Sequence, residues 1–221
     1  MAEKKLHPLE RFDQKIREEN GVEFIAGFDE AGRGPLAGPV SSAGVVLPPD
    51  FFDERINDSK QLTDRQRREL CAEIKKAALA YSVILVPVET IDEINILEAD
   101  RLGMETALKE ISEKVRVDYI ITDYMKLHTS IPLLSIPKGD ATSLAVAAAS
   151  ILAKVTRDDY MIELDGKYPE YGFKKNKGYG TKAHLEALEK YGYVKGVHRL
   201  SFEPVRSMAH PVVQLKLFGE D

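Results

Sequence analysis

Residues 24–40 read FIAGFDEAGRGPLAGPV. An apolar run ends at the adjacent acids Asp29 and Glu30, and a stretch rich in glycine and proline precedes the next apolar run. This pattern predicts a strand over residues 24–28, a loop, and a second strand over residues 40–47. Because successive side chains of a strand point to opposite faces, the two acids can share one site only if the backbone leaves the strand at this point.

The rest of the chain alternates between helical and strand-like patterns. We expect further strands over residues 81–88, 117–122 and 133–136, and helices over residues 9–19, 63–80, 90–115, 141–164 and 181–191. This order predicts an α/β fold with a mixed sheet, in which the C-terminal third forms a helical appendage.

The composition is that of one compact domain. The chain has 221 residues, of which 43% are hydrophobic, and a single cysteine, Cys71, which excludes a disulfide within the chain and favours a cytoplasmic location. The N-terminus has no secretory signal, and the longest stretch of low polarity, residues 141–155, is too short to span a membrane. A net charge of −5 mildly disfavours a nucleic-acid partner, but carboxylates neutralised by bound metal would distort that sum.

Four acids stand where expected strands or connections end: Asp29, Glu30, Asp123 and Asp140. Carboxylate oxygens are the ligands that Mg²⁺ and Mn²⁺ prefer, and two such ions roughly 3.5 to 4 Å apart can hold the attacking and leaving oxygens of a phosphodiester. The alternative is that each acid is a solvated turn residue or a helix cap, which applies above all to Asp140 because a helix follows it.

The stretch Gly32 to Ala37 formally satisfies the G-x-G-x-x-A pattern of dinucleotide-binding proteins. That pattern requires a helix whose N-terminus holds the pyrophosphate, whereas a strand is expected here. A dinucleotide site is therefore excluded.

Several blocks occur in the order and spacing of one known family. Residues 27–40 resemble the opening signature of ribonuclease HII, and further blocks resemble this family at residues 58–62 (DSKQL), 138–140 (KGD), 147–158 (AAASILAKVTRD), 177–181 (KGYGT) and 198–202 (HRLSF). The resemblance implies a ribonuclease H-like fold with a five-stranded mixed sheet, flanking helices and a helical C-terminal extension. It divides the chain into an N-terminal lead-in (1–21), a catalytic domain (22–205, with the extension from about 160) and a tail (206–221).

The resemblance also implies an activity and its site. Such enzymes hydrolyse the phosphodiester 5′ to a ribonucleotide in an RNA/DNA hybrid or a DNA duplex, leaving 3′-hydroxyl and 5′-phosphate ends. Asp29 would bridge two Mg²⁺ or Mn²⁺ ions, and Glu30, Asp123 and Asp140 would complete their ligand shells. One departure is Tyr124, which follows Asp123 where the family commonly has glycine.

Further positions of the resemblance concern the substrate. Gly32-Arg33-Gly34 would sense the ribose 2′-hydroxyl, and Tyr179 would stack on the sugar of the following deoxynucleotide. Lys60 is a candidate for a phosphate contact. The lysines around Tyr179, together with the later basic residues, suit contacts to a duplex backbone: Lys174, Lys175, Lys177, Lys182, Lys195, His198 and Arg199. We interpret His184 and His198 as structural or substrate-contacting because both are too isolated in sequence to bind metal.

The C-terminal segment QLKLF resembles a peptide that docks on the bacterial DNA sliding clamp, with Gln214, Leu217 and Phe218 as contact residues; the alternative is a tail that packs on its own domain. Otherwise we expect a monomer whose partner is RNA/DNA hybrid or ribonucleotide-containing DNA. Two alternative functions are a catalytically weak binding module on the clamp and a ribonuclease HIII. The latter would have a different opening signature and a long N-terminal substrate-binding domain.

Overall fold

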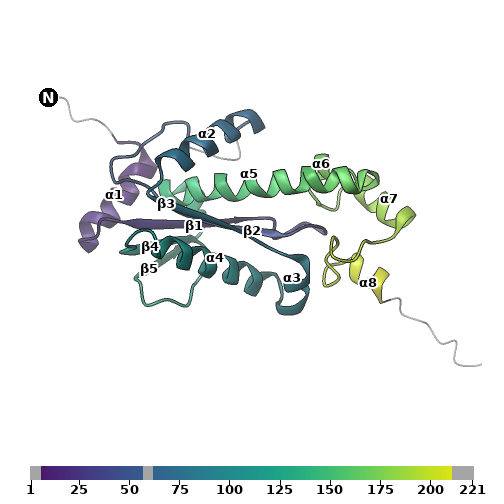
Figure 1. Ribbon diagram of the computed structural model, residues 1–221. Coiled ribbons are helices and arrows are strands. Elements are labelled where there is room, and N and C mark those ends of the chain that lie inside the picture. Colours follow the sequence, from purple (N-terminus) through teal and green to yellow (C-terminus); the bar gives the residue numbers. More distant parts are fainter. Residues whose placement is uncertain (1–5, 57–61, 211–221) are drawn as a thin grey trace, which may run out of the picture.

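The computed structural model describes residues 6–56 and 62–210 (Figure 1). The strands are β1 (Ile25–Ala31), β2 (Val40–Val46), β3 (Ala80–Val86), β4 (Tyr119–Asp123) and β5 (Leu133–Ile136). The α-helices are α1 (Pro8–Asn20), α2 (Asp64–Ala77), α3 (Val88–Ile94), α4 (Ile96–Ser112), α5 (Leu144–Lys167), α6 (Phe173–Asn176), α7 (Lys182–Tyr191) and α8 (Val205–Ala209). Two 3₁₀ turns are η1 (Gly139–Ala141) and η2 (Pro169–Tyr171).

The five strands form one mixed sheet in the order β3-β2-β1-β4-β5. The hairpin of β1 and β2 is antiparallel, as is the pair of β2 and β3. In contrast, β4 and β5 run parallel to β1. The expected mixed sheet is therefore confirmed, and the C-terminal ends of three parallel strands lie at one edge.

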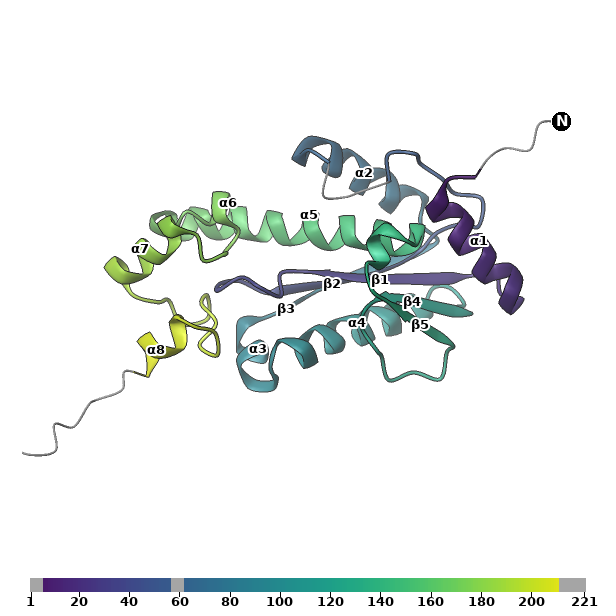
Figure 2. The same cartoon turned by 180° about the vertical axis from the view of Figure 1, so that it is seen from behind.

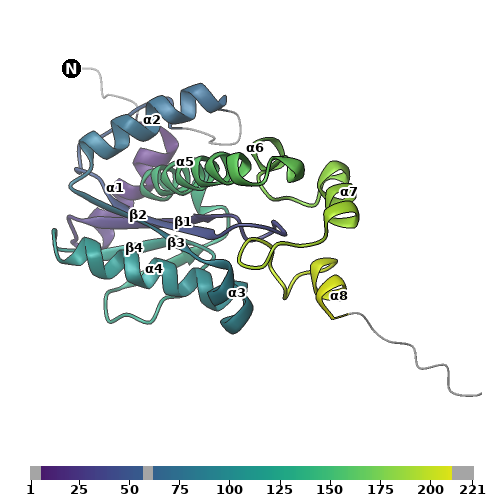
Figure 3. The ribbon, with the colours of Figure 1, turned by 45° about the vertical axis from the view of Figure 1, so that its right-hand side comes forward.

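Helices cover both faces of the sheet, as Figure 3 shows. Helix α5 crosses one face and α4 the other, while α1 and α2 pack beside α5 on the same face. Helix α5 lies directly on β1, because a Cβ atom at Gly27 would lie 2.2 Å from the carbonyl carbon of Ala145. Fully buried side chains such as Phe28 and Ile120 fill the space between the sheet and α4.

The chain beyond α5 forms a separate packing unit, residues 168–210, which we call the C-terminal lobe (Figure 2). Helix α5 continues without a break to Lys167, so the lobe is built on the helix that covers the sheet. Its core joins Phe173 to Met161 of α5 and to Leu36 of the loop after β1. The expected helical extension is thus present. In the described part of the chain, no helix has the length and hydropathy needed to cross a membrane.

Some expected boundaries are wrong for local reasons. The helix expected over residues 90–115 is two helices, because Asn95 adopts φ 70° and its side chain caps α4 by accepting the N–H groups of Leu97 and Glu98. Thr63 does cap α2, through a reciprocal capping box with Gln66, but that helix ends at Ala77 and not near residue 80.

Candidate active site

Three of the four expected acids meet at the C-terminal edge of the parallel strands. The last pairing of β1 with β4 joins Phe28 to Thr122, so Asp29 and Asp123 follow at neighbouring positions. The N–H of Gly139 donates to Asp123 Oδ1 at 3.0 Å, and this bond holds the η1 turn, with Asp140, against the same edge. Ligand sites in sheets with parallel strands occur characteristically at such an edge.

The carboxyl of Asp29 is buried at this edge, with a relative exposure of 5%. It accepts hydrogen bonds from the N–H of Glu30, at 2.8 Å, and from the hydroxyl of Ser150 on α5. The pKa of Asp29 is raised to about 7, chiefly by burial and in addition by the negative charges of Asp123 and Asp140, against the opposing hydrogen bonds. In the absence of a cation Asp29 is therefore protonated in part of the molecules near neutral pH.

Glu30 lies on the other face of the sheet. Regular pairing of β1 with β2 continues through Ala31 and Ser41, so the backbone stays in the strand at the acidic pair. Glu30 consequently points toward α4, where Arg33 Nε lies 3.0 Å from its Oε1. The departure from the strand that a shared site was expected to need is not required, because Glu30 at the end of β1 still lies close enough to Asp29 for that charge to act on it. Burial raises the pKa of Glu30 to about 9, with contributions from the charges of Asp100 and Asp29, while Arg33 opposes this rise.

The acids fit a divalent cation chemically. Glu30 Oε2 is buried and has no hydrogen-bond partner among the described residues, which leaves its lone pairs available to a ligand. The donors are all carboxylate oxygens, which hard cations prefer, and a cation would remove the repulsion that raises the pKa values of Asp29 and Glu30. Among residues 6–56 and 62–210, however, no three His, Cys, Asp or Glu side chains already converge closely enough to hold an ion.

The structure decides one alternative for Asp140. The N-cap of α5 is Ser143, whose Oγ accepts the N–H of Val146 at 3.3 Å. Asp140 lies in the preceding 3₁₀ turn and has a relative exposure of 8%. The interpretation of Asp140 as the cap of the long helix is therefore wrong, and its carboxylate belongs to the edge that also carries Asp123.

Tyr124 shows why a glycine suits the position after Asp123. Its backbone is left-handed, with φ 56°, and its N–H still donates to Ile136 O at 3.0 Å. The left-handed turn therefore forms even with a tyrosine side chain, which disfavours this backbone conformation and is 75% exposed next to Asp123.

A cleft of about 410 Å³ opens between the sheet edge, α2, α5 and the loop after β1. It is lined by Glu30, Ala31, Gly32, Arg33, Gly34, Arg67, Ser150, Lys154, Arg157 and Tyr179. The ring of Tyr179 lies beside Gly34, since a Cβ atom there would be 3.6 Å from Tyr179 Cε1. The structure therefore brings Tyr179 to the expected glycine-rich motif, although the two are far apart in sequence.

Two buried arginines hold the glycine-rich loop by its carbonyl groups. Arg199 donates to the carbonyls of Gly32, at 2.6 Å, and Arg33, at 2.9 Å, while Arg157 donates to that of Ala37 at 3.0 Å. No acceptor within the described part of the chain pairs with the N–H groups of Arg33 and Gly34. The loop thus has its carbonyls turned into the protein and these two amide groups left for a ligand.

The side chain of Arg33 is committed within the protein. Its Nε and Nη2 donate to Oδ2 of Asp100, at 2.8 and 2.6 Å, and Asp100 is fully buried on α4. Ser42 donates to the other oxygen of Asp100 at 2.7 Å. Arg33 is therefore placed to hold Glu30 and the loop.

Several cleft residues were not identified from sequence. Ser150 and Lys154 lie four residues apart on α5, so helical periodicity within the block at residues 147–158 could have grouped them. No sequence signal distinguishes Asp100 from an ordinary helix carboxylate. The buried positions of His198 and Arg199, each 0% exposed, exclude the expected direct contacts to a duplex. Lys60, Gln214, Leu217 and Phe218 lie outside the described residues.

Comparisons with known proteins agree with this geometry. The chain matches the family Ribonuclease HII over residues 26–205. It is 50% identical over 200 residues to ribonuclease HII of Bacillus mycoides, covering 90% of this chain and 76% of that protein. It is also 50% identical over 204 residues to ribonuclease HII of Bacillus cereus, covering 92% of this chain and 78% of that protein.

Solved structures share the fold. Ribonuclease H2 of Pyrococcus horikoshii OT3 superposes with a TM-score of 0.72 at 29% identity, covering 84% of this chain and 96% of that one. Bst-RNase HIII in complex with Mn²⁺ superposes with a TM-score of 0.70 at 18% identity, covering 85% and 69%, which supports the fold alone.

The mixed sheet, its flanking helices and the acids at its edge define a ribonuclease H, an endonuclease of a class that depends on divalent metal. Within this class the chain belongs to the ribonuclease HII family. The match to this family decides against the ribonuclease HIII alternative. The alternative of a catalytically weak binding module is tested by the incision assay described below.

Proposed function

We propose that the protein hydrolyses the phosphodiester 5′ to ribonucleotides, both in RNA/DNA hybrids and at single ribonucleotides in duplex DNA, leaving 3′-hydroxyl and 5′-phosphate ends. One observation carries the proposal. Buried and half-buried acids meet at one end of the sheet, and one of them, Glu30, has a carboxylate oxygen that lacks a partner among the described residues. Glu30 lines a cleft whose other wall is a glycine-rich loop with two amide groups that are likewise unpaired in the described part of the chain. Removal of ribonucleotides from DNA is the corresponding role.

Asp29, Glu30, Asp123 and Asp140 would hold two Mg²⁺ or Mn²⁺ ions. When bound, these ions supply Lewis acidity at the attacking and leaving oxygens of the phosphodiester. The chain itself fixes the acids: Ser150 and the N–H of Glu30 orient Asp29, and the N–H of Gly139 orients Asp123. Bst-RNase HIII, a protein of the same fold, has been solved in complex with Mn²⁺.

The opposite wall of the cleft suits recognition of a ribose. Glycine at position 34 lets the backbone approach the sugar, and a 2′-hydroxyl can both donate to and accept from groups at that distance. Lys154 and Arg67 line the cleft where phosphates of a duplex would approach, and they supply contacts that do not depend on sequence. Tyr179, 46% exposed beside Gly34, is placed to stack on the sugar that follows the ribonucleotide.

A duplex with one embedded ribonucleotide tests the proposal directly. With Mg²⁺ or Mn²⁺ we expect a single incision 5′ to the ribonucleotide and mapped ends of the stated chemistry. Asp29→Asn should abolish it, because the carboxylate is central to the acidic group. Incision that survives this substitution, or ends of the opposite polarity, would contradict the mechanism.

Tyr179→Ala tests junction recognition. Loss of a stacked aromatic costs about 1 to 3 kcal/mol, so we expect incision at a single ribonucleotide to fall roughly 5- to 100-fold. Cleavage of long hybrid should fall less, since many registers of a hybrid remain acceptable. Equal losses on both substrates would remove Tyr179 from this role.

We also propose that the tail containing Gln214, Leu217 and Phe218 docks on a DNA sliding clamp. A ribonuclease HII from Archaeoglobus fulgidus, with a TM-score of 0.66 and 28% identity over 80% of this chain and 92% of that one, has been solved in complex with PCNA. Removal of residues 214–221 should abolish binding to the clamp and spare cleavage of short duplexes. Unchanged clamp binding would contradict the docking role and favour the alternative of a tail packed on its own domain.

A further inference from the structure

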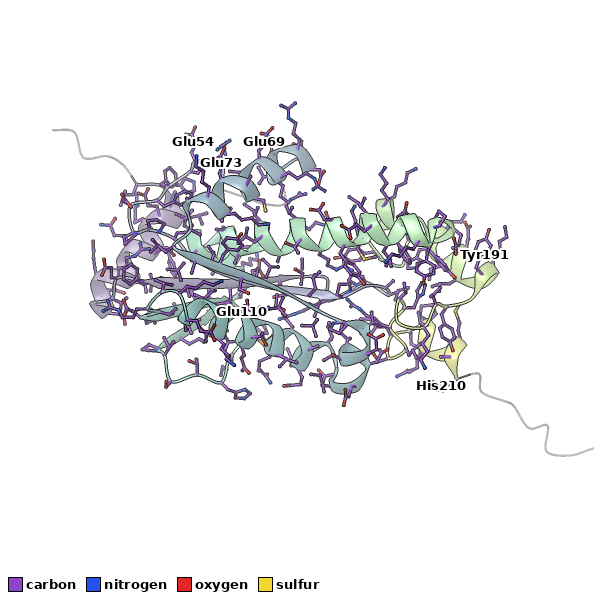
Figure 4. The ribbon with its side chains drawn as sticks, in the orientation of Figure 1. Glu54, Glu69, Glu73, Glu110, Tyr191 and His210 are labelled. Atoms are coloured by element: carbon purple, nitrogen blue, oxygen red, sulfur yellow. The ribbon has the colours of Figure 1, made fainter. Side chains whose placement is uncertain are left out.

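Two buried histidines lie in contact in the C-terminal lobe and take no part in the proposed chemistry. His184 is on α7 and His198 is in the segment before α8, and both are 0% exposed. Their Nε2 atoms are 3.2 Å apart. Their spacing in sequence suggested two isolated residues, but the fold brings the two rings into contact. The rings of Tyr171 and Phe173 surround the pair. The ring of Tyr191, labelled on the C-terminal lobe in Figure 4, contacts that of Tyr171.

The two ends of this pair determine where its protons lie. The carbonyl of Tyr179 can only accept, so His184 Nδ1, 2.9 Å away, carries a hydrogen. The N–H of Val194 can only donate, so His198 Nδ1, 3.0 Å away, carries none. In neutral rings this leaves His198 Nε2 as donor and His184 Nε2 as acceptor. Both ends independently require the same direction for the central hydrogen bond.

Burial favours the neutral state that this direction needs. It lowers the pKa of His198 to about 4, with a further contribution from His184, and it lowers the pKa of His184 as well. A protonated His198 would place two donors face to face at Val194. A single ordered chain of hydrogen bonds therefore runs from Val194 through both rings to Tyr179.

This chain connects the two parts that border the ribose side of the cleft. His198 pairs with Ala37 of the glycine-rich loop in an isolated β-bridge, and the next residue, Arg199, donates its backbone N–H to Leu36 O at 2.8 Å. At the other end, Tyr179 places its ring beside Gly34. The histidines are thus one connection between loop and ring, in addition to the direct hydrogen bond from the N–H of Leu36 to the carbonyl of Gly178, at 2.8 Å, and the bonds that Arg157 donates to Ala37 and Lys177.

We propose that His184 and His198 form a hydrogen-bond relay that positions Tyr179 against Gly34 and thereby sets the preference for an RNA-to-DNA junction. The histidines are positioning residues, since neither reaches the substrate. The inference rests on the proposed role of Tyr179 and extends it to two residues outside the cleft. Apolar side chains of similar size would fill the same space, but they would leave the Val194 N–H without a partner or remove one of the two donors of the Tyr179 carbonyl, which also accepts from the N–H of Thr181 at 2.7 Å.

Paired substitutions separate positioning from packing. The amide nitrogen of Asn can occupy the place of Nδ1 and donate to Tyr179 O, whereas Leu retains bulk without a donor. We expect His184→Leu to lower the ratio of single-ribonucleotide incision to long-hybrid cleavage by about twofold to tenfold, the range of one lost hydrogen bond. His184→Asn should lower the ratio less than His184→Leu does, because Asn restores the donor to Tyr179 O but not the acceptor for His198 Nε2.

Tyr171→Phe is the matched control. It removes the hydrogen bond from Tyr171 Oη to Gly192 O, 2.8 Å long, from the same cluster and leaves the relay intact. The ratio should then be unchanged. If His184→Leu alters both substrates equally, or if Tyr171→Phe lowers the ratio as much, the relay is refuted and the pair is only packing.

The protons can also be observed without activity. Long-range ¹H–¹⁵N spectra of the wild-type protein at pH 7 should show opposite tautomers, Nδ1–H for His184 and Nε2–H for His198. Identical tautomers would overturn the relay even if His184→Leu failed to fold. Absence of any incision by the wild-type protein would instead overturn the proposed function. When incision is present, the ratio of single-ribonucleotide incision to long-hybrid cleavage and the ¹H–¹⁵N spectra test the relay.

Discussion

Replacement of Asp29 by Asn should destroy activity and at the same time stabilise the metal-free protein. The carboxyl is 5% exposed and shares the sheet edge with Asp123 and Asp140. Asn keeps an oxygen that can accept from Ser150 and from the N–H of Glu30, but it carries no charge. The substitution therefore removes the repulsion and the desolvation of the charge, and leaves most of the contacts.

The size of the effect follows from the pKa of Asp29, which burial and then the neighbouring charges raise from 3.8 to about 7. At about 1.4 kcal/mol per tenfold change in proton affinity, this difference corresponds to about 4 kcal/mol as an upper bound. The folded state holds a proton that the unfolded state has released, so stability is lost as pH rises from about 4 through about 7. Since Asn also loses the charge-assisted part of its hydrogen bonds, we expect a gain of about 2 kcal/mol at pH 8.

Urea denaturation in EDTA at pH 5 and pH 8 measures this gain. Asp29→Asn should exceed wild type at pH 8 and match it more closely at pH 5, where the wild-type carboxyl keeps its proton. Asp118→Asn is a control of opposite sign. Burial of Asp118 is outweighed by hydrogen bonds from Phe24, Arg116 and Glu23, which lower the pKa of this carboxyl, so its loss should destabilise at pH 8.

Added Mg²⁺ should reverse the order at pH 8, because it stabilises only a folded state that binds it. Wild type should then gain stability with Mg²⁺ concentration and Asp29→Asn should not. A variant less stable than wild type in EDTA at pH 8, or a difference independent of pH, would refute the assignment of a strained acidic group to this edge.

Other predictions concern the loop and the cleft. Gly32→Ala should lower the free energy of unfolding, measured in urea, by roughly 2 kcal/mol or more, because φ is +102° and the new Cβ would lie 2.0 Å from Arg157 Nε. Gly166→Ala, with open space around it, should instead raise the free energy of unfolding by about 0.5 to 1 kcal/mol. A destabilised Gly166→Ala would contradict this account. Lys154→Ala should raise KM for duplexes about threefold to tenfold and reduce the salt dependence of binding by about one counterion, as a binding titration against NaCl would show. An unchanged salt slope would exclude a phosphate contact.

The order of strands and helices could be predicted from sequence because hydrophobic periodicity reflects burial on one or both faces of an element. Boundaries depended on single residues whose effect requires knowledge of the backbone. Asn95 divides one expected helix through a left-handed φ, and a tyrosine at position 124 keeps a turn that suits glycine. Neither residue type excludes a helix or a turn on propensity alone.

The sequence indicated that Asp29, Asp123 and Asp140 lie at strand ends, but not the direction in which each acid points. The sequence could not show that β1 continues through Ala31, and this extension sends Asp29 toward α5 and Glu30 toward α4. Nor could it show that Asp100 binds Arg33, since the two are joined only when α4 packs on the sheet. Contacts between distant segments depend on register and on layer packing, which a single sequence does not specify.

The buried arginines explain how a loop with little regular structure is kept in one conformation. Burial lowers the pKa of Arg157 to about 10 and that of Arg199 to about 9, so each guanidinium costs stability as a charge. A strand partner would satisfy the loop carbonyls only by pairing the amide groups on the same backbone as well. A guanidinium carries five donors and no acceptor, so it satisfies the carbonyls and leaves the N–H groups of Arg33 and Gly34, two residues that line the cleft, without a partner among the described residues. The cost of two buried cations is thus coupled to the exposure of the backbone groups that the proposed recognition of ribose requires.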